Sequence, residues 1–218
     1  NIIMGNNKEQ IKKYLNKQEI KVISKLNTPS KIQDFLDKMP FNFENQGETY
    51  YSPREVFVHR KAHCFEGALF AITALKYHGI ESYLLDLKAK RPDSDHVVAV
   101  FKINGYLGAI SKTNHAVLRY RDPIYKTNRE LALSFFHEYF LNTGQKTLIS
   151  FSKPFDPFKI FDCSWVAQQN DLDTIAEAID KSAHIDFVPK ENRRYIRRAS
   201  QIEIEAGKIE QYNNKSHE

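Results

Sequence analysis

Apolar residues recur at helical spacing along the N-terminal part of the chain. A short stripe near the start predicts an amphipathic helix and consists of Ile11, Tyr14 and Leu15. A clearer helix begins at Thr28-Pro29, because proline is favoured in a first turn, and its apolar face consists of Ile32, Phe35, Leu36 and Met39. Ser52-Pro53 predicts the start of a further helix.

The middle of the chain changes from helical to strand-like patterns. Residues 64–78 are apolar on nearly every side, which predicts a central, buried helix that ends at Gly79. Three following runs predict strands, at residues 81–87, 96–103 and 106–111. Asn104-Gly105 is a strong signal for a two-residue hairpin, so we expect neighbouring strands to be antiparallel. The order predicts an α+β fold in which a buried, Cys-bearing helix packs on an antiparallel sheet.

The C-terminal part returns to helical spacing. We predict a helix over residues 129–141, a strand over 147–151, a turn-rich connection over 153–158 and a helix over 172–179. Residues 191–212 carry apolar side chains at alternating steps of four and three, at Tyr195, Ala199, Ile202, Ala206 and Ile209. This narrow stripe predicts one long helix that packs along its own domain or mediates self-association.

Length and composition fit one globular domain. The 218 residues suffice for one buried core, and 41% hydrophobic with 27% charged residues is ordinary for a soluble protein. We assign residues 1–218 to a single domain. Its core spans about 50–125, with helical extensions over 1–49 and about 154–218.

Charge and cysteine content narrow the partners and the compartment. A net charge of +5 is only moderately basic, and glutamates follow the basic face of the last helix, so we expect no nucleic acid partner. No apolar run has the length of a membrane span, and the first residues lack the apolar core of a signal peptide. Two cysteines outside any CxxC pair favour a reducing compartment, so we expect a cytoplasmic location.

The run HRKAHCFEGA, residues 59–68, places Cys64 after several basic residues at the start of the buried helix. The exposed N–H groups of a helix start favour a thiolate, and so do the neighbouring Arg60, Lys61 and, when it is protonated, His63. His96 opens an apolar strand after a polar loop, so its ring can reach a cleft. Cys64 with His96 as its base is therefore the candidate catalytic pair. The other cysteine, Cys163, has the pattern of an ordinary buried thiol.

A zinc site is the alternative for the same part of the chain. Imidazole and thiolate are ligands that suit zinc, and the candidates are His59, His63, Cys64 and His96. Their spacing lacks the paired C-x2-C or H-x3-H pattern of settled zinc scaffolds. We therefore expect neither a metal nor a cofactor.

Residues 55–75 (EVFVHRKAHCFEGALFAITAL), residues 79–83 and the strand that His96 opens resemble the transglutaminase-like, papain-related family. In that family a Cys opens a buried helix, a His opens the next-but-one strand and an Asp ends the strand after it. The resemblance covers about residues 50–125 and implies a Cys–His–Asp triad that transfers acyl groups through a thioester. Members include peptidases, amidases, protein cross-linkers and inactive binding proteins.

Carried onto this chain, the family pattern assigns Cys64 as nucleophile and His96 as base but places no carboxylate at the third position. Ser111 stands where the family has Asp, and a hydroxyl stabilises an imidazolium less than a carboxylate does. Asn114 is a second candidate, because an amide fills this role in papain-like enzymes. Asp122 is a third, because it begins an Asp-Pro pair like the one that often ends the family motif.

The resemblance implies hydrolysis of an amide bond in a peptide or protein through a Cys–His thioester. The backbone N–H of Cys64 would help to hold the oxyanion, with a second donor from Gln46 or Tyr51.

Two further expectations concern specificity and the competing functions. Lys88, Lys90 and Arg91 lie near His96 in the sequence and would steer an acidic substrate toward it. The alternative functions are an amine-dependent transglutaminase and a non-catalytic binding protein that keeps the scaffold. Ser111 favours the binding protein.

Overall fold

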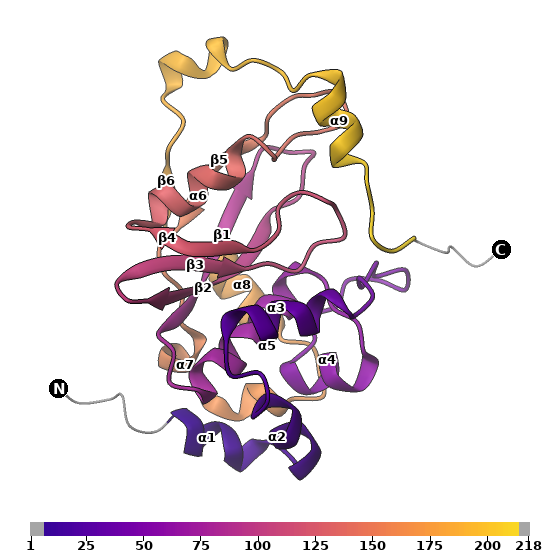
Figure 1. Ribbon diagram of the computed structural model, residues 1–218, viewed down its shortest axis with the longest axis vertical. Coiled ribbons are helices and arrows are strands. Elements are labelled where there is room, and N and C mark those ends of the chain that lie inside the picture. The colour runs from indigo at the N-terminus through magenta and orange to yellow at the C-terminus, as the bar shows by residue number, and fades with distance from the viewer. Residues whose placement is uncertain (1–6, 214–218) are drawn as a thin grey trace.

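A six-stranded antiparallel sheet organises residues 7–213, which are the residues that the computed structural model describes (Figure 1). In space the strands follow the order β4-β3-β2-β1-β5-β6. Their bounds are β1 (Ser82–Ala89), β2 (His96–Ile103), β3 (Tyr106–Ile110), β4 (Arg121–Tyr125), β5 (Leu148–Ser152) and β6 (His184–Asp186). The predicted hairpin between β2 and β3 is confirmed, and Asn104 and Gly105 both have positive φ, as the tight Asn-Gly turn requires.

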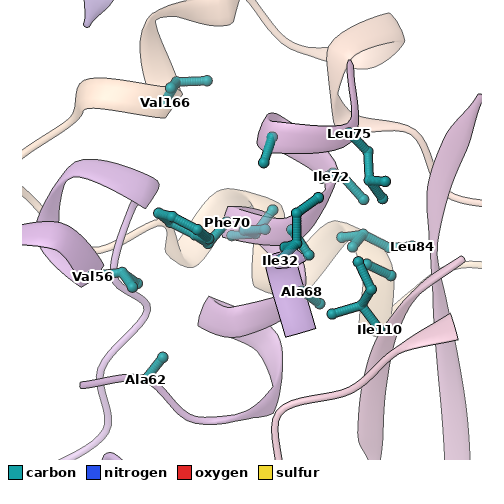
Figure 2. Packing of buried hydrophobic residues seen from close by; sticks show 14 of the residues in the cluster. Ile32, Val56, Ala62, Ala68, Phe70, Ile72, Leu75, Leu84, Ile110 and Val166 are labelled. Carbon is teal, nitrogen blue, oxygen red and sulfur yellow. The ribbon is translucent and has the colours of Figure 1, made fainter. Parts of the chain in front are cut away.

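The predicted Cys-bearing helix is α5 (Cys64–Tyr77), and every residue after Cys64 is buried. It packs on β1 and β2 and is surrounded by other helices, namely α1 (Asn7–Tyr14), α3 (Pro29–Asp37), α4 (Pro53–His59), the 3-10 helix η1 (Cys163–Ala167) and α8 (Asp173–Asp180). Figure 2 shows Ile32, Val56 and Leu84 converging on this helix from α3, α4 and β1. The buried position explains why α5 has no polar face.

The opposite face of the sheet carries a second, smaller core. Helix α6 (Asn128–Phe136) covers it and contacts β3, β4 and β5, and its Leu131 and Phe135 belong to one buried cluster with Leu85 of β1. Adjacent residues of β1 serve the two cores, because Leu84 belongs to the α5 side and Leu85 to the α6 side. The sheet is therefore covered on both faces, and the α+β fold expected from the sequence is confirmed.

The predicted N-terminal helices agree with α1, α3 and α4, and Thr28 and Ser52 cap the two that proline opens. Two short helices complete this side, α2 (Lys17–Ile23) and α7 (Pro157–Ile160). Helix α6 ends at Phe136, several residues before the predicted end. Strands β5 and β6 lie outside residues 50–125 but extend the same sheet beyond β1.

The single long helix predicted over residues 191–212 is wrong. A 3-10 helix η2 (Lys190–Tyr195) and α9 (Gln201–Gly207) replace it, separated by extended backbone. Ser200 starts α9 anew, because its backbone N–H and hydroxyl both bond the Glu203 carboxylate. The apolar stripe is not one face, since Tyr195 is 70% and Ile202 79% exposed. Self-association through such a helix therefore loses its structural basis.

The segment after α9 returns to the body of the protein beside the loop that follows β3. Ala116 N–H donates to the Ile209 carbonyl at 2.9 Å, and Gln211 N–H donates to the Asn114 carbonyl at 2.8 Å. Residues 209–212 thus lie along residues 114–116. Among residues 7–213, no helix combines the length and apolarity needed to cross a bilayer.

Candidate active site

Cys64 is the first residue of α5 and is partly exposed, unlike the rest of that helix. His63 precedes it in extended conformation as the N-cap residue. A helix start leaves its first backbone N–H groups without carbonyl partners, so the Cys64 N–H is available to an oxyanion. The helix therefore presents a sulfur and a backbone donor at the same point.

Two cavities meet at Cys64. One has a volume of about 550 Å³ and the other about 460 Å³, and Cys64, Ser94 and Asp95 line both. His96 lines the smaller cavity, together with Asn114, Tyr139 and Glu210. A substrate chain on either side of the sulfur would find space there.

His96 is the first residue of β2, and its ring is held by Ser111. Its Nε2 lies 2.7 Å from the Ser111 Oγ. The Ser111 hydroxyl donates its own proton to the Leu118 carbonyl at 2.5 Å, because a carbonyl can only accept. Ser111 therefore accepts from His96, which places a proton on Nε2 and leaves Nδ1 for Cys64.

Ser111 is itself fixed by Gln33 of α3. The Gln33 amide accepts from the Ser111 N–H and donates to the Ser111 carbonyl, both at 2.9 Å. Gln33 and Ser111 are both buried. The hydroxyl that orients His96 is thus anchored to a helix on the α5 side of the sheet.

A second imidazole reaches the sulfur from the other direction. The His63 ring is buried, and its Nε2 lies 2.8 Å from the Thr49 carbonyl. The same nitrogen lies 3.4 Å from a Glu66 carboxylate oxygen and 3.8 Å from one of Glu44. His63 therefore occupies a negative environment directly beside Cys64.

Glu66 is completely buried and anchors this region through several donors. The His63 N–H donates to it at 2.9 Å, as expected of a residue three positions after an N-cap. The Thr49 hydroxyl donates at 2.8 Å and the Tyr51 N–H at 3.1 Å, and the Asn42 amide adds further bonds. These bonds satisfy a carboxylate that would otherwise be costly to bury.

The two imidazoles determine the ionisation of the sulfur. Burial on its own would raise the pKa of Cys64, but hydrogen bonds and charge from His63 and His96 outweigh it and hold that pKa well below 9. Burial likewise opposes the charged form of His63. The hydrogen bond to Cys64 and the charges of Cys64 and Glu66 nevertheless raise the pKa of His63 to about 9. The geometry therefore favours a thiolate–imidazolium pair.

The other two candidates for the third residue lie elsewhere. The Asn114 amide donates to the Tyr212 carbonyl at 2.8 Å and accepts from the Tyr212 N–H at 2.9 Å, rather than bonding His96. Asp122 is exposed on the edge strand β4, two strands away from β2. Ser111 is the candidate that the fold brings to the His96 ring.

The suggested second oxyanion donors do not line either cavity. Gln46 is exposed, and the Tyr51 N–H is used by Glu66 while its ring stacks on His59 at 4.7 Å. The neighbouring Tyr50 lines the larger cavity instead.

The larger cavity is predominantly acidic, which disfavours the predicted attraction of an acidic substrate. With Arg91, its charged lining consists of Glu48, Asp86, Asp95, Asp173, Glu177 and Asp180. Lys88 is engaged by two of these carboxylates, at 2.9 Å from Asp95 and in a shorter contact with Asp180. Burial raises the pKa of Asp86 to about 6 although His184 bonds it.

The four residues of the zinc alternative do not form one ligand group, although His63 and His96 approach Cys64 from two sides. His59 is exposed and pairs with Glu55 at 3.2 Å. Within the described part of the chain, the group with metal-like proximity is formed by Asp86, Asp95 and Asp180, where the Lys88 ammonium bonds two of the three.

Sequence reasoning missed the roles of Glu66 and Gln33. The role of Glu66 could have been recognised from the sequence, because a Glu three residues after an N-cap position is a capping pattern. The sequence gives no signal for the role of Gln33, because its hydrogen bond with Ser111 joins segments 78 residues apart.

A helix that opens with cysteine and packs on an antiparallel sheet, with a histidine at the start of the neighbouring strand, is the arrangement of the transglutaminase-like fold. Residues 6–122, more than half of the chain, match the family model described as a transglutaminase-like domain. The chain belongs to this family.

Solved structures of one protein are similar to this chain. Legionella pneumophila LapG gives a TM-score of 0.35 at 16% identity, covering 51% of this chain and 73% of that one. The EGTA-treated form of LapG gives a TM-score of 0.41 at 11% identity, covering 76% of this chain and 96% of that one. No curated protein matches the chain.

Proposed function

We propose that this protein is a thiol-dependent hydrolase of amide bonds in peptides or proteins, with Cys64 as its nucleophile and His96 as its base. One observation carries the proposal. A partly exposed sulfur lies where two cavities meet, and two imidazoles lower its pKa against the effect of burial. A thiol with no chemical role has no need of such surroundings, since burial alone makes thiols less acidic.

In the first half of the reaction, the ionised sulfur attacks an amide carbonyl. The Cys64 N–H at the start of α5 stabilises the oxyanion. The C–N bond breaks as the leaving nitrogen receives a proton from an imidazolium beside the sulfur, and a thioester forms.

In the second half, water attacks the thioester while His96 accepts its proton through Nδ1. The C–S bond breaks, an acid is released and the sulfur returns to its ionised form. Ser111 is the third residue in this scheme, because its hydroxyl holds the proton on the other nitrogen, Nε2.

A mixed library of synthetic peptides tests the proposal, with new termini identified by mass spectrometry. We expect wild type and Cys163→Ala to cleave alike. Cys64→Ala should lose about 10³-fold or more of this activity, and His96→Ala about 10²-fold or more. Equal cleavage by wild type and Cys64→Ala would refute the proposal.

The same samples separate the two alternative functions. Incorporation of a fluorescent primary amine into glutamine peptides, dependent on Cys64, would assign a transglutaminase. A peptidyl electrophile that fails to label Cys64 in wild type, while the same peptides still bind, would assign a non-catalytic binding protein. Ser111 in place of a carboxylate keeps this second alternative in view.

A further inference from the structure

The His96 ring has no carboxylate to stabilise a positive charge. Its Nε2 faces the hydroxyl of Ser111. Four acidic residues line the same cavity. Three are engaged elsewhere: Asp93 by Thr147, Asp95 by Lys88 and Glu138 by Arg121. The fourth, Glu210, is exposed. The Lys112 ammonium in that lining bonds the carbonyls of Leu36 and Met39. Within residues 7–213, His96 forms no ion pair with a carboxylate.

The His63 ring, unlike that of His96, lies close to carboxylates. Its Nε2 lies 2.8 Å from the Thr49 carbonyl, 3.4 Å from Glu66 and 3.8 Å from Glu44. Glu66 is fully buried, so its field is poorly screened by water. Phe65 stacks on the ring, with centroids 6.4 Å apart, and covers it with an apolar surface. An imidazolium is stabilised at this position by two carboxylates and a carbonyl.

The Thr49 carbonyl also fixes which nitrogen of His63 carries the proton. A carbonyl only accepts hydrogen bonds, so the 2.8 Å contact requires a proton on Nε2. The remaining nitrogen, Nδ1, is then the one that can receive a proton from the adjacent sulfur, with which the side chain interacts.

We propose that His63, rather than His96, holds the proton that Cys64 releases in the resting enzyme, and that Thr49 and Glu66 fix its ring for this role. The S–H bond of Cys64 breaks, an N–H bond forms at Nδ1 of His63, and the number of protons is unchanged. The carboxylate absent from the third position of the family pattern is thus replaced by Glu66 on the other side of the sulfur.

This role rests on the proposed function, because it concerns the same nucleophile, but it divides the work differently. His63 sets the charge of the sulfur. His96, whose Nε2–H faces the Ser111 hydroxyl, keeps Nδ1 as the base for water. The proton that it takes from water then passes by way of the sulfur to Nδ1 of His63, which restores the resting pair. The raised pKa of His63, about 9, agrees with this division.

Long-range ¹H–¹⁵N correlation spectra of histidine-labelled protein at pH 7.5 test the proposal without altering the site. His63 should show both ring nitrogens protonated, and His96 should carry a proton on Nε2. His63→Gln and His96→Gln spectra assign the two signals. A neutral His63, whatever the state of His96, overturns the proposal.

Alkylation by iodoacetamide gives an independent readout that does not depend on a substrate. In a Cys163→Ser background, His63→Gln should lower the alkylation rate of Cys64 at pH 6.5 by roughly tenfold or more, and His96→Gln by less than threefold. His59→Gln is the matched control, because His59 pairs with Glu55 on the surface, and it should leave the rate unchanged. Thermal unfolding checks that each variant is folded.

The two proposals fail in different ways. If Cys64 of the wild type titrates like a free thiol, the proposed function and this role fall together. If Cys64 titrates low and only His96→Gln raises its midpoint, the nucleophile stands and His63 loses its role.

Discussion

The two cysteines of this chain occupy the same position in their helices, yet their surroundings drive them in opposite directions. Cys64 opens α5 after the N-cap residue His63, and Cys163 opens η1 after the N-cap residue Asp162. Both are partly exposed. Burial, and then the Asp162 carboxylate, raise the pKa of Cys163 to about 11. Two imidazoles lower the pKa of Cys64 despite burial.

The difference shows that a helix start does not by itself activate a thiol. At Cys64 two imidazoles outweigh burial, whereas at Cys163 burial raises the pKa and the Asp162 carboxylate adds to the rise. Arg60 and Lys61, which the sequence places near Cys64, are not among the groups that lower its pKa, because their side chains lie over aromatic rings instead. Arg60 is 5.2 Å from the centre of the Phe57 ring and Lys61 is 5.8 Å from that of Tyr51.

The largest expected effect is the difference in reactivity between the two cysteines. At pH 6.5 in folded wild type, iodoacetamide should alkylate Cys64 roughly 10²-fold faster than Cys163. The thiolate fraction favours Cys64 by more, but a more acidic thiol is intrinsically less nucleophilic. Peptide mass spectrometry of quenched samples measures both rates. Equal rates would erase the contrast.

The hydrogen bonds of Ser111, which orient the His96 ring, give the next largest effect. Ser111→Asp restores the residue type of the family pattern but removes the donor to the Leu118 carbonyl. We expect the free energy of unfolding to fall by about 1–3 kcal/mol, because two acceptors then face each other in a buried place. Urea unfolding measures it, with Ser94→Asp on the exposed loop as control. Unchanged stability with faster peptide cleavage would contradict this account.

A smaller effect concerns folding stability and pH. The pKa of His63 is raised from 6.5 to about 9, so its contribution is complete below pH 6.5 and is lost as pH rises through about 9. The pKa of Cys64 is lowered from 9, so its contribution is complete above pH 9 and is lost as pH falls. From pH 6.5 to 9 the two changes offset each other, since folded and unfolded chains bind the same number of protons.

The difference in unfolding free energy between wild type and Cys64→Ser should therefore be flat from about pH 6.5 to 9 and should shrink on acidification below 6.5. Denaturant unfolding at pH 5, 7 and 8.5 measures it. A difference that already declines between pH 7 and 8.5 would mean that His63 is charged without a thiolate partner.

The smallest expected effect lies at Cys163. Asp162→Asn removes a charge but keeps an oxygen that can accept from the Ser164 N–H, as the carboxylate does at 2.9 Å. The pKa of Cys163 should fall only partly, because burial is the larger cause of its shift. We expect roughly threefold faster alkylation of Cys163 at pH 8.5, with the Cys64 rate unchanged as the internal control. No acceleration would leave burial as the whole explanation.

Much of the fold was accessible to pattern reasoning because burial imposes periodicity. Helix α5 and the hairpin through Asn104 were predicted because each depends on neighbours in sequence. The C-terminal segment was mispredicted for the same reason. An apolar spacing of four and three cannot show that Ser200 begins a new helix or that Ile202 faces solvent.

In the candidate site, too, local features could be predicted from the sequence and contacts between distant segments could not. Cys64 and His96 could be selected as candidates because a cysteine at a helix start and a histidine at a strand start are local signals. The contacts that tune them are not local. Gln33 reaches Ser111 across the fold, and the Thr49 carbonyl that orients His63 is a backbone atom, which any residue type would offer.

Residues 207–212 form part of the lining of the smaller cavity beside His96. Gly207 and Glu210 line this cavity, and Tyr212 forms two hydrogen bonds with Asn114. Changes of length or sequence in this tail can reshape the space for a ligand while the reacting groups stay untouched.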